Sequence, residues 1–140
     1  MTQRTAPVVR RGAGLLLLGY LVVVAALTFA PLVEPRVLAE LVSLVTRVTG
    51  HDGGLVGRWV ERLSNVALFV PLAVLLCQAL PRVRRRLVWV ACLLGSVGVE
   101  LVQLLFLPAR TASLADVATN STGAAVGVVL HWLVTRRRGR

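Results

Sequence analysis

Two apolar stretches of the sequence each contain a pair of polar residues whose spacing could place them on one helical face. Glu100 and Gln103 are three positions apart, and Asp116 and Asn120 are four apart, which are the separations of neighbours on a helix. A charge at the centre of a membrane helix costs about 2.5–3.5 kcal/mol. Such groups are therefore expected where they have partners, water or a function. The two carboxyl groups could act as a general acid and base, or they could bind a polar ligand together with the amides.

The composition places the chain among membrane proteins. It has 140 residues, of which 56% are hydrophobic, and a mean hydropathy of +0.79, whereas soluble domains average about 45–50% apolar residues. All 16 basic residues are arginine, and the formal net charge is +10. The arginines flank apolar segments and form no patch interleaved with aromatic residues, so we expect no nucleic-acid partner.

Four apolar segments predict four transmembrane helices, since about 20 apolar residues cross the hydrocarbon core. The first apolar run is long, and Pro31 follows its small residues, which argues against a cleaved signal peptide. The sequence thus predicts an all-α bundle in a single domain over residues 1–140. The predicted spans cover residues 14–33, 64–80, 87–107 and 115–134.

The segment between the first two spans has apolar residues at helical spacing. It predicts a short amphipathic helix over about 36–48 that lies on the membrane surface. Pro35 suits its first turn and Gly50 suits its end, and the HDGG sequence at 51–54 predicts a turn. This helix could be a simple connector packed on the bundle or a lid.

The distribution of arginine predicts the orientation in the membrane. Eleven of the 16 arginines lie at the N-terminus, in the 81–86 loop and in the C-terminal tail. Cytoplasmic loops carry the excess of positive charge. We therefore predict that both termini are cytoplasmic and that the predicted amphipathic helix is outside.

This orientation places the polar residues at one depth. Glu100 would lie about 10 Å below the outer boundary at 1.5 Å per residue, and Arg110 belongs to the loop that follows. The planar guanidinium of Arg110 is expected to pair with Glu100 or Asp116. We predict an outward-facing polar pocket lined by Asn65, Glu100, Gln103, Arg110, Asp116 and Asn120.

The alternative to a pocket is a network that only fastens the helices together. Polar contacts do hold membrane helices, although Gly123 and Gly127 already supply a close-packing GxxxG face. Ser96, Ser121 and Thr122 are expected to bond backbone carbonyls within their own helices.

The sequence has no metal-ligand spacing, no nucleophile arrangement and no phosphate-binding glycine loop. Cys77 and Cys92 are predicted to be small buried hydrophobic residues, and His131 is expected near the inner interface. We predict no metal and no cofactor.

The polar residues and their neighbours resemble the VanZ-like family of small bacterial membrane proteins. The resemblance covers about residues 65–127. It rests on Asn65 followed by FVP at 69–71 near a helix start, ELVQ at 100–103, Arg110, and DVATNSTG at 116–123. Where members often have glycine two residues after the proline, this chain has Ala73, which argues against tight packing there.

The resemblance implies a family named for an accessory protein in low-level resistance to teicoplanin-type glycopeptides. We therefore predict an envelope protein that binds a membrane lipid, a lipid-linked cell-wall precursor or a lipoglycopeptide, and that is not an enzyme. One alternative is an enzyme acting on a lipid-linked substrate, with Glu100 and Asp116 as catalytic acid and base. Another is a transporter or channel subunit, which the apolar inner halves of the helices argue against. The sequence leaves the ligand, the oligomeric state and the partner of Arg110 open.

Overall fold

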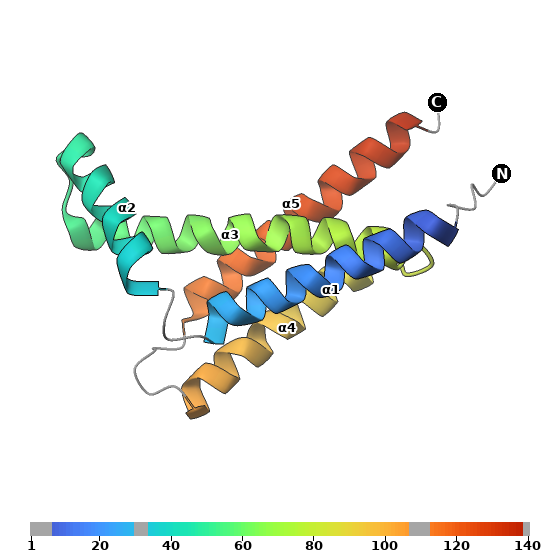
Figure 1. Cartoon of the computed structure of the whole chain (residues 1–140), viewed down its shortest axis with the longest axis horizontal. Coiled ribbons are helices and arrows are strands. Elements are labelled where there is room, and N and C mark those ends of the chain that lie inside the picture. The colour runs from blue at the N-terminus through green and yellow to red at the C-terminus, as the bar shows by residue number, and fades with distance from the viewer. Residues whose placement is uncertain (1–6, 30–33, 107–112, 139–140) are drawn as a thin grey trace.

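A computed structural model describes residues 7–29, 34–106 and 113–138 of the chain, with side chains over 12–26, 39–106 and 113–137. These residues form five helices joined by short connections (Figure 1). In chain order, the helices are α1 (Pro7–Phe29), α2 (Glu34–Thr49), α3 (Gly53–Ala79), α4 (Arg85–Phe106) and α5 (Leu114–Arg138). The all-helical fold predicted from the sequence is confirmed.

Three of these helices are long and apolar enough to cross a membrane: Gly53–Ala79, Arg85–Phe106 and Leu114–Arg137. They correspond to the last three predicted spans. The predicted first span overlaps α1, in which the apolar stretch within the described part is Gly12–Ala26. The end of that span lies outside the described residues, so a fourth crossing stays a prediction.

Helix α3 begins at Gly53, well before the start near residue 64 that the hydropathy predicted. The reason is a helix cap in the HDGG segment, where Asp52 Oδ1 accepts a hydrogen bond from the N–H of Leu55 at 2.9 Å. The expectation that HDGG is only a turn was therefore wrong. Helix α2 does end before Gly50, as predicted, and Gly50 adopts a φ of 69°, the left-handed conformation common just after a helix.

Pro71 lies in the middle of α3, whereas the resemblance placed its motif near a helix start. A proline has no N–H and disturbs the carbonyls one turn earlier. The carbonyl that loses its helical donor is that of Ala67, four residues before Pro71. At the next residue, the hydroxyl of Tyr20 in α1 donates to the carbonyl of Leu68 at 2.7 Å, which attaches α1 to α3.

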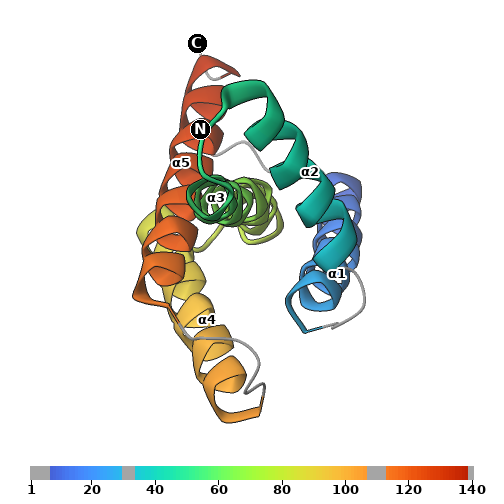
Figure 2. The same cartoon turned by 90° about the vertical axis from the view of Figure 1, so that its left-hand side faces the viewer.

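Helix α3 lies at the centre of the arrangement. Seen nearly along its axis in Figure 2, α4 and α5 lie on one side of it, and α1 and α2 lie on the other. Its most extensive packing is with α5, and α4 and α5 also pack together, as their short predicted connection suggested. The start of α1, the end of α5 and the turn between α3 and α4 lie on the same side of the molecule (Figure 1).

The close contact of α3 with α5 depends on glycine. A Cβ built on Gly123 would lie 3.0 Å from the Cα of Val66, and one built on Gly127 would lie 2.9 Å from the Cβ of Ala73. Ala73 is fully buried. The expectation of looser packing at Ala73 was therefore wrong, because the facing helix contributes the glycine.

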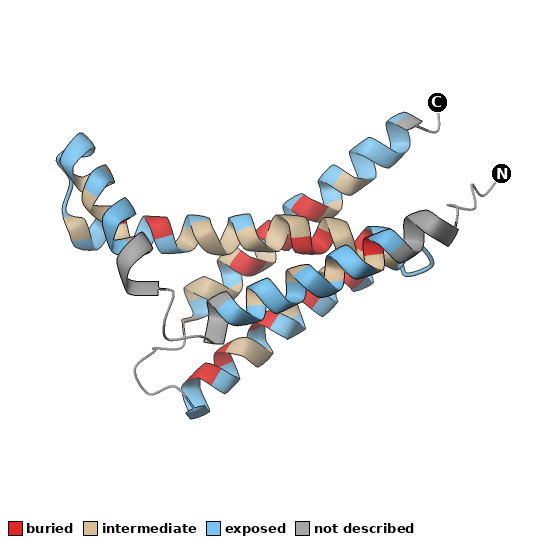
Figure 3. Cartoon of the chain, in the orientation of Figure 1, coloured by how far each residue is buried: buried red, intermediate tan, exposed pale blue. Residues whose placement is uncertain are grey.

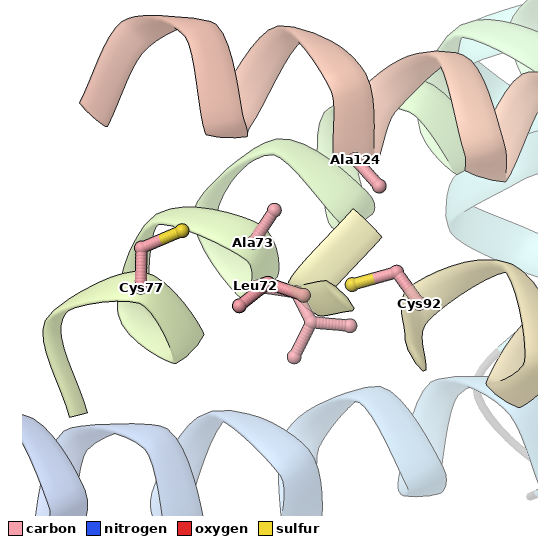
Figure 4. Close-up of a cluster of buried hydrophobic side chains, with 6 residues drawn as sticks. Leu72, Ala73, Cys77, Cys92 and Ala124 are labelled. Carbon is pink, nitrogen blue, oxygen red and sulfur yellow. The ribbon is translucent and has the colours of Figure 1, made fainter. Parts of the chain in front are cut away.

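Buried residues gather where the helices cross, and much of the remaining helical surface is exposed and apolar (Figure 3). The hydrophobic core contains Leu72, Ala73, Cys77, Val88, Cys92 and Ala124 (Figure 4). Both cysteines are buried and free, as predicted. An exposed apolar surface of this extent fits helices that contact lipid.

Candidate functional site

The first link of the candidate site joins α3 to α5. The side-chain amide Nδ2 of Asn65 donates to Oδ1 of Asp116 at 2.9 Å. Asn65 lies one turn before Phe69, which contacts Gly123, so the glycine packing of these helices brings the two polar side chains into reach. Both residues are half-buried.

The second link joins α4 to the start of α5. Oε2 of Glu100 accepts a hydrogen bond from the backbone N–H of Ser113 at 2.8 Å. The hydroxyl oxygen of Ser113 in turn accepts from the N–H of Ala115 at 3.2 Å, so Ser113 caps α5. Glu100 as a whole is only 9% exposed. Its carboxyl group lies at the N-terminus of α5, where amides lack helical partners and the helix dipole favours negative charge.

The third link lies one turn deeper between the same two helices. Nδ2 of Asn120 donates to the hydroxyl oxygen of Ser96 at 2.8 Å. Ser96 is 0% exposed and Asn120 is 6% exposed. Oδ1 of Asn120 is buried and has no hydrogen-bond partner among the described residues. A buried acceptor without a partner costs about 1–3 kcal/mol, so this oxygen is suited to a donor from a water molecule or a ligand.

The described charges around these links are mostly negative. Glu61, one turn before Asn65, interacts electrostatically with both Asp116 and Glu100. Arg62 interacts electrostatically with Asp116, and its guanidinium lies over the ring of Trp59, 5.7 Å from the centroid. The carboxyl groups of Glu61, Glu100 and Asp116 therefore lie within electrostatic reach of one another, and Arg62 offsets part of their charge.

Five of the six predicted site residues lie in the described part of the chain. Asn65, Glu100, Asp116 and Asn120 each take part in one of the three links, and Gln103 is buried on α4 one turn beyond Glu100. Arg110 lies outside the described residues, so its pairing with a carboxylate stays a prediction.

Sequence reasoning missed four residues of this cluster: Glu61, Arg62, Ser96 and Ser113. Ser96 was expected to bond its own helix backbone, but it accepts a hydrogen bond from Asn120. Its position four residues before Glu100 was a usable signal, because it places both on one face of α4. Glu61 and Arg62 were missed because the second span was expected to begin after them.

Two further expectations concern hydroxyl groups and metals. Thr122 donates to the carbonyl of Ala118 at 2.8 Å, as predicted for a hydroxyl within a membrane helix. Within the described part of the chain, no group of three or more His, Cys, Asp or Glu residues could hold a metal ion. The groups that the three links provide are the carboxyl groups of Glu100 and Asp116 and the side-chain oxygen of Asn120, which could bind a ligand or, for the carboxyl groups, transfer a proton.

One known protein family matches most of the chain. The family model described as VanZ/LLP1 matches residues 17–135, a range that includes all six predicted site residues. No curated protein and no solved structure matches the chain. Because the family match covers most of the 140 residues, the chain belongs to the VanZ/LLP1 family.

Proposed function

We propose that this family member binds a lipid-anchored or amphiphilic ligand at the outer surface of a bacterial plasma membrane. In this proposal the ligand is a membrane lipid, a lipid-linked cell-wall precursor or a lipoglycopeptide. The consequence for the cell is a role in the envelope, including tolerance of teicoplanin-type glycopeptides. The protein acts by binding and does not catalyse a reaction.

The proposed topology has four transmembrane helices and cytoplasmic termini. It is supported by the three long apolar helices and by the arginines at the end of the bundle that carries the turn between α3 and α4. Helix α2 lies at the opposite end of α3 (Figure 1) and exposes Leu41, Leu44 and Val48. These residues share one side of the helix, as expected for a helix that rests on the outer membrane surface.

The observation that carries the proposal is the unpartnered Oδ1 of Asn120 next to three hydrogen-bonded links. A network that served only to fasten helices would be expected to satisfy its own buried acceptors. Here Asn120 and Ser96 lie one turn deeper than Glu100, and a buried oxygen remains available for a donor. A ligand whose acyl chain lies in lipid and whose headgroup carries hydroxyl or amide donors would match this site.

The test uses a deletion strain complemented with the wild type, Glu100→Gln or Thr122→Ala. Glu100→Gln keeps the size of the side chain and removes its charge, while Thr122→Ala removes only an exposed hydroxyl bonded within its own helix. Tolerance of teicoplanin and of a lipoglycopeptide is measured, with insertion checked by cysteine labelling. We expect rescue by the wild type and by Thr122→Ala, but not by Glu100→Gln. Equal rescue by all three proteins would indicate that the polar residues only hold the helices together.

A membrane-embedded enzyme is the second candidate, because Glu100 and Asp116 interact electrostatically and could act as an acid–base pair. This activity would alter a lipid or a lipid-linked precursor. Lipids from strains with the wild type and with Asp116→Asn are compared by mass spectrometry. A species present only with the wild type would favour the enzyme, and identical profiles would count against it.

A further inference from the structure

The opposite end of the bundle carries a concentration of exposed arginine without acidic counter-charge. This arginine end contains the turn between α3 and α4, the first turn of α4 and the last turns of α5. Its exposed arginines are Arg82, Arg84, Arg85, Arg86, Arg136 and Arg137. The sequence has no Asp or Glu within residues 79–99 or 117–140, so no carboxylate of these segments neutralises them.

One of these arginines is fixed between two helices. Nη2 of Arg85, at the start of α4, donates to the hydroxyl oxygen of Thr135 in α5 at 3.1 Å. One residue further along α5, the guanidinium of Arg136 lies over the ring of Trp132, 5.2 Å from its centroid. Two guanidinium groups are thereby held beside the junction of α4 and α5.

The same junction exposes apolar side chains next to the arginines: Val83, Leu87, Leu133 and Val134. A free anion would interact only with the arginines of such a surface. A phospholipid would interact with the arginines through its phosphate and with the apolar side chains through its acyl chains. Basic positions between membrane helices on the cytoplasmic side bind anionic headgroups in this way.

We propose that the junction of α4 and α5 at the arginine end is a binding site for an anionic phospholipid, with Arg85 as its principal phosphate ligand. The bond that Arg85 donates to Thr135 leaves the remaining guanidinium N–H groups of Arg85 for phosphate oxygens. Arg136, positioned on Trp132, adds a second positive charge. The site is separate from the proposed outer ligand site and does not depend on it.

The experiment compares two variants that remove the same charge. The purified full-length protein and its Arg85→Gln and Arg86→Gln variants are titrated with phosphatidylglycerol in detergent micelles, and lipid binding is followed by native mass spectrometry. Phosphatidylcholine and inorganic phosphate serve as alternative ligands. We expect phosphatidylglycerol to bind selectively. Arg85→Gln is expected to weaken its affinity about fivefold more than Arg86→Gln, because only Arg85 would make the charge-assisted hydrogen bonds.

Several results would overturn this site. If both variants lost the same affinity for phosphatidylglycerol, the lipid would be attracted by all the arginines together and not by Arg85. If phosphatidylcholine bound as tightly as phosphatidylglycerol, the charge of the headgroup would not determine binding. Competition by millimolar inorganic phosphate would identify a phosphate site instead of a lipid site. If Arg85→Gln does not fold, Thr135→Val replaces it, since that variant keeps every arginine but releases the side chain of Arg85. Unchanged affinity in Thr135→Val would then contradict the proposal.

Discussion

The packing of α3 on α5 makes Gly127→Ala the most informative single substitution. The new methyl group would overlap the backbone carbonyl oxygen of Val70, and it would lie 2.9 Å from Cβ of Ala73 and 3.2 Å from the carbonyl carbon of Val70. Two of these three atoms belong to the backbone, so a side-chain rotation cannot relieve the overlap. The helices must move apart instead.

The expected loss of stability in Gly127→Ala is estimated by comparison with a glycine at which an added Cβ would meet no neighbour. A Cβ on Gly95 of α4 would meet nothing within 4 Å. Both alanine variants gain helix propensity, up to about 1 kcal/mol relative to glycine, and this gain cancels in the comparison. The remaining difference is the cost of overpacking, about 1–3 kcal/mol. Gly127→Ala is therefore expected to be less stable than Gly95→Ala by that amount.

Unfolding in mixed micelles of increasing SDS content, followed by circular dichroism, measures this difference. A second variant, Gly127→Ala combined with Ala73→Gly, removes the Cβ–Cβ overlap but leaves the overlap with Val70. Because Ala73→Gly alone costs up to about 1 kcal/mol of helix propensity, the double variant is compared with Ala73→Gly. Adding Gly127→Ala to that variant should cost less than adding it to the wild type, but should still destabilise the protein. Equal stability of Gly127→Ala and Gly95→Ala would refute the reasoning, since it would mean that α3 and α5 do not approach as closely as the glycines permit.

Two further substitutions test local interactions, with stability measured by the same unfolding method. Asp52→Ala should destabilise the start of α3 by about 0.5–2 kcal/mol, because the N–H of Leu55 loses its cap. Asp52→Asn should retain most of the stability, and an equal loss of stability in both variants would contradict the cap. Ser96→Ala should lower the stability by about 0.6–1.7 kcal/mol, because the amide of buried Asn120 loses its partner. Thr122→Ala should lower the stability less, and a larger loss of stability in Thr122→Ala would contradict the importance of the buried pair.

The sequence predicted the long helices because hydropathy reports them directly. It missed the true start of α3 because Asp52 and the two glycines after it also suit a turn, and local composition cannot distinguish a turn from a capped helix. The predicted span 64–80 already contained Pro71, but the resemblance placed its motif near the start of that helix. Because α3 begins at Gly53, Pro71 lies in its middle, next to the bond from Tyr20 to Leu68.

The candidate site was predictable to the extent that helical spacing and depth determine it. Glu100, Asp116 and Asn120 could be assigned to one end of the bundle from their positions along the chain. Their partners could not be assigned, because pairing depends on the rotation and approach of the helices. Only the structure shows that Asp116 meets Asn65 while Glu100 meets the backbone of Ser113.

The glycine face and the polar cluster, which the sequence suggested as alternatives, are parts of one arrangement. Gly123 lets α5 approach α3 near Phe69, and the same approach brings Asp116 to Asn65. Close packing at the glycines therefore attaches α5 to α3, whereas the bonds of Glu100 and Ser96 attach α4 to α5 and its first turn. The Asn120–Ser96 pair leaves Oδ1 of Asn120 buried and without a partner among the described residues. Because such an acceptor costs about 1–3 kcal/mol, a hydrogen-bond donor supplied at this α4–α5 contact would stabilise the bundle.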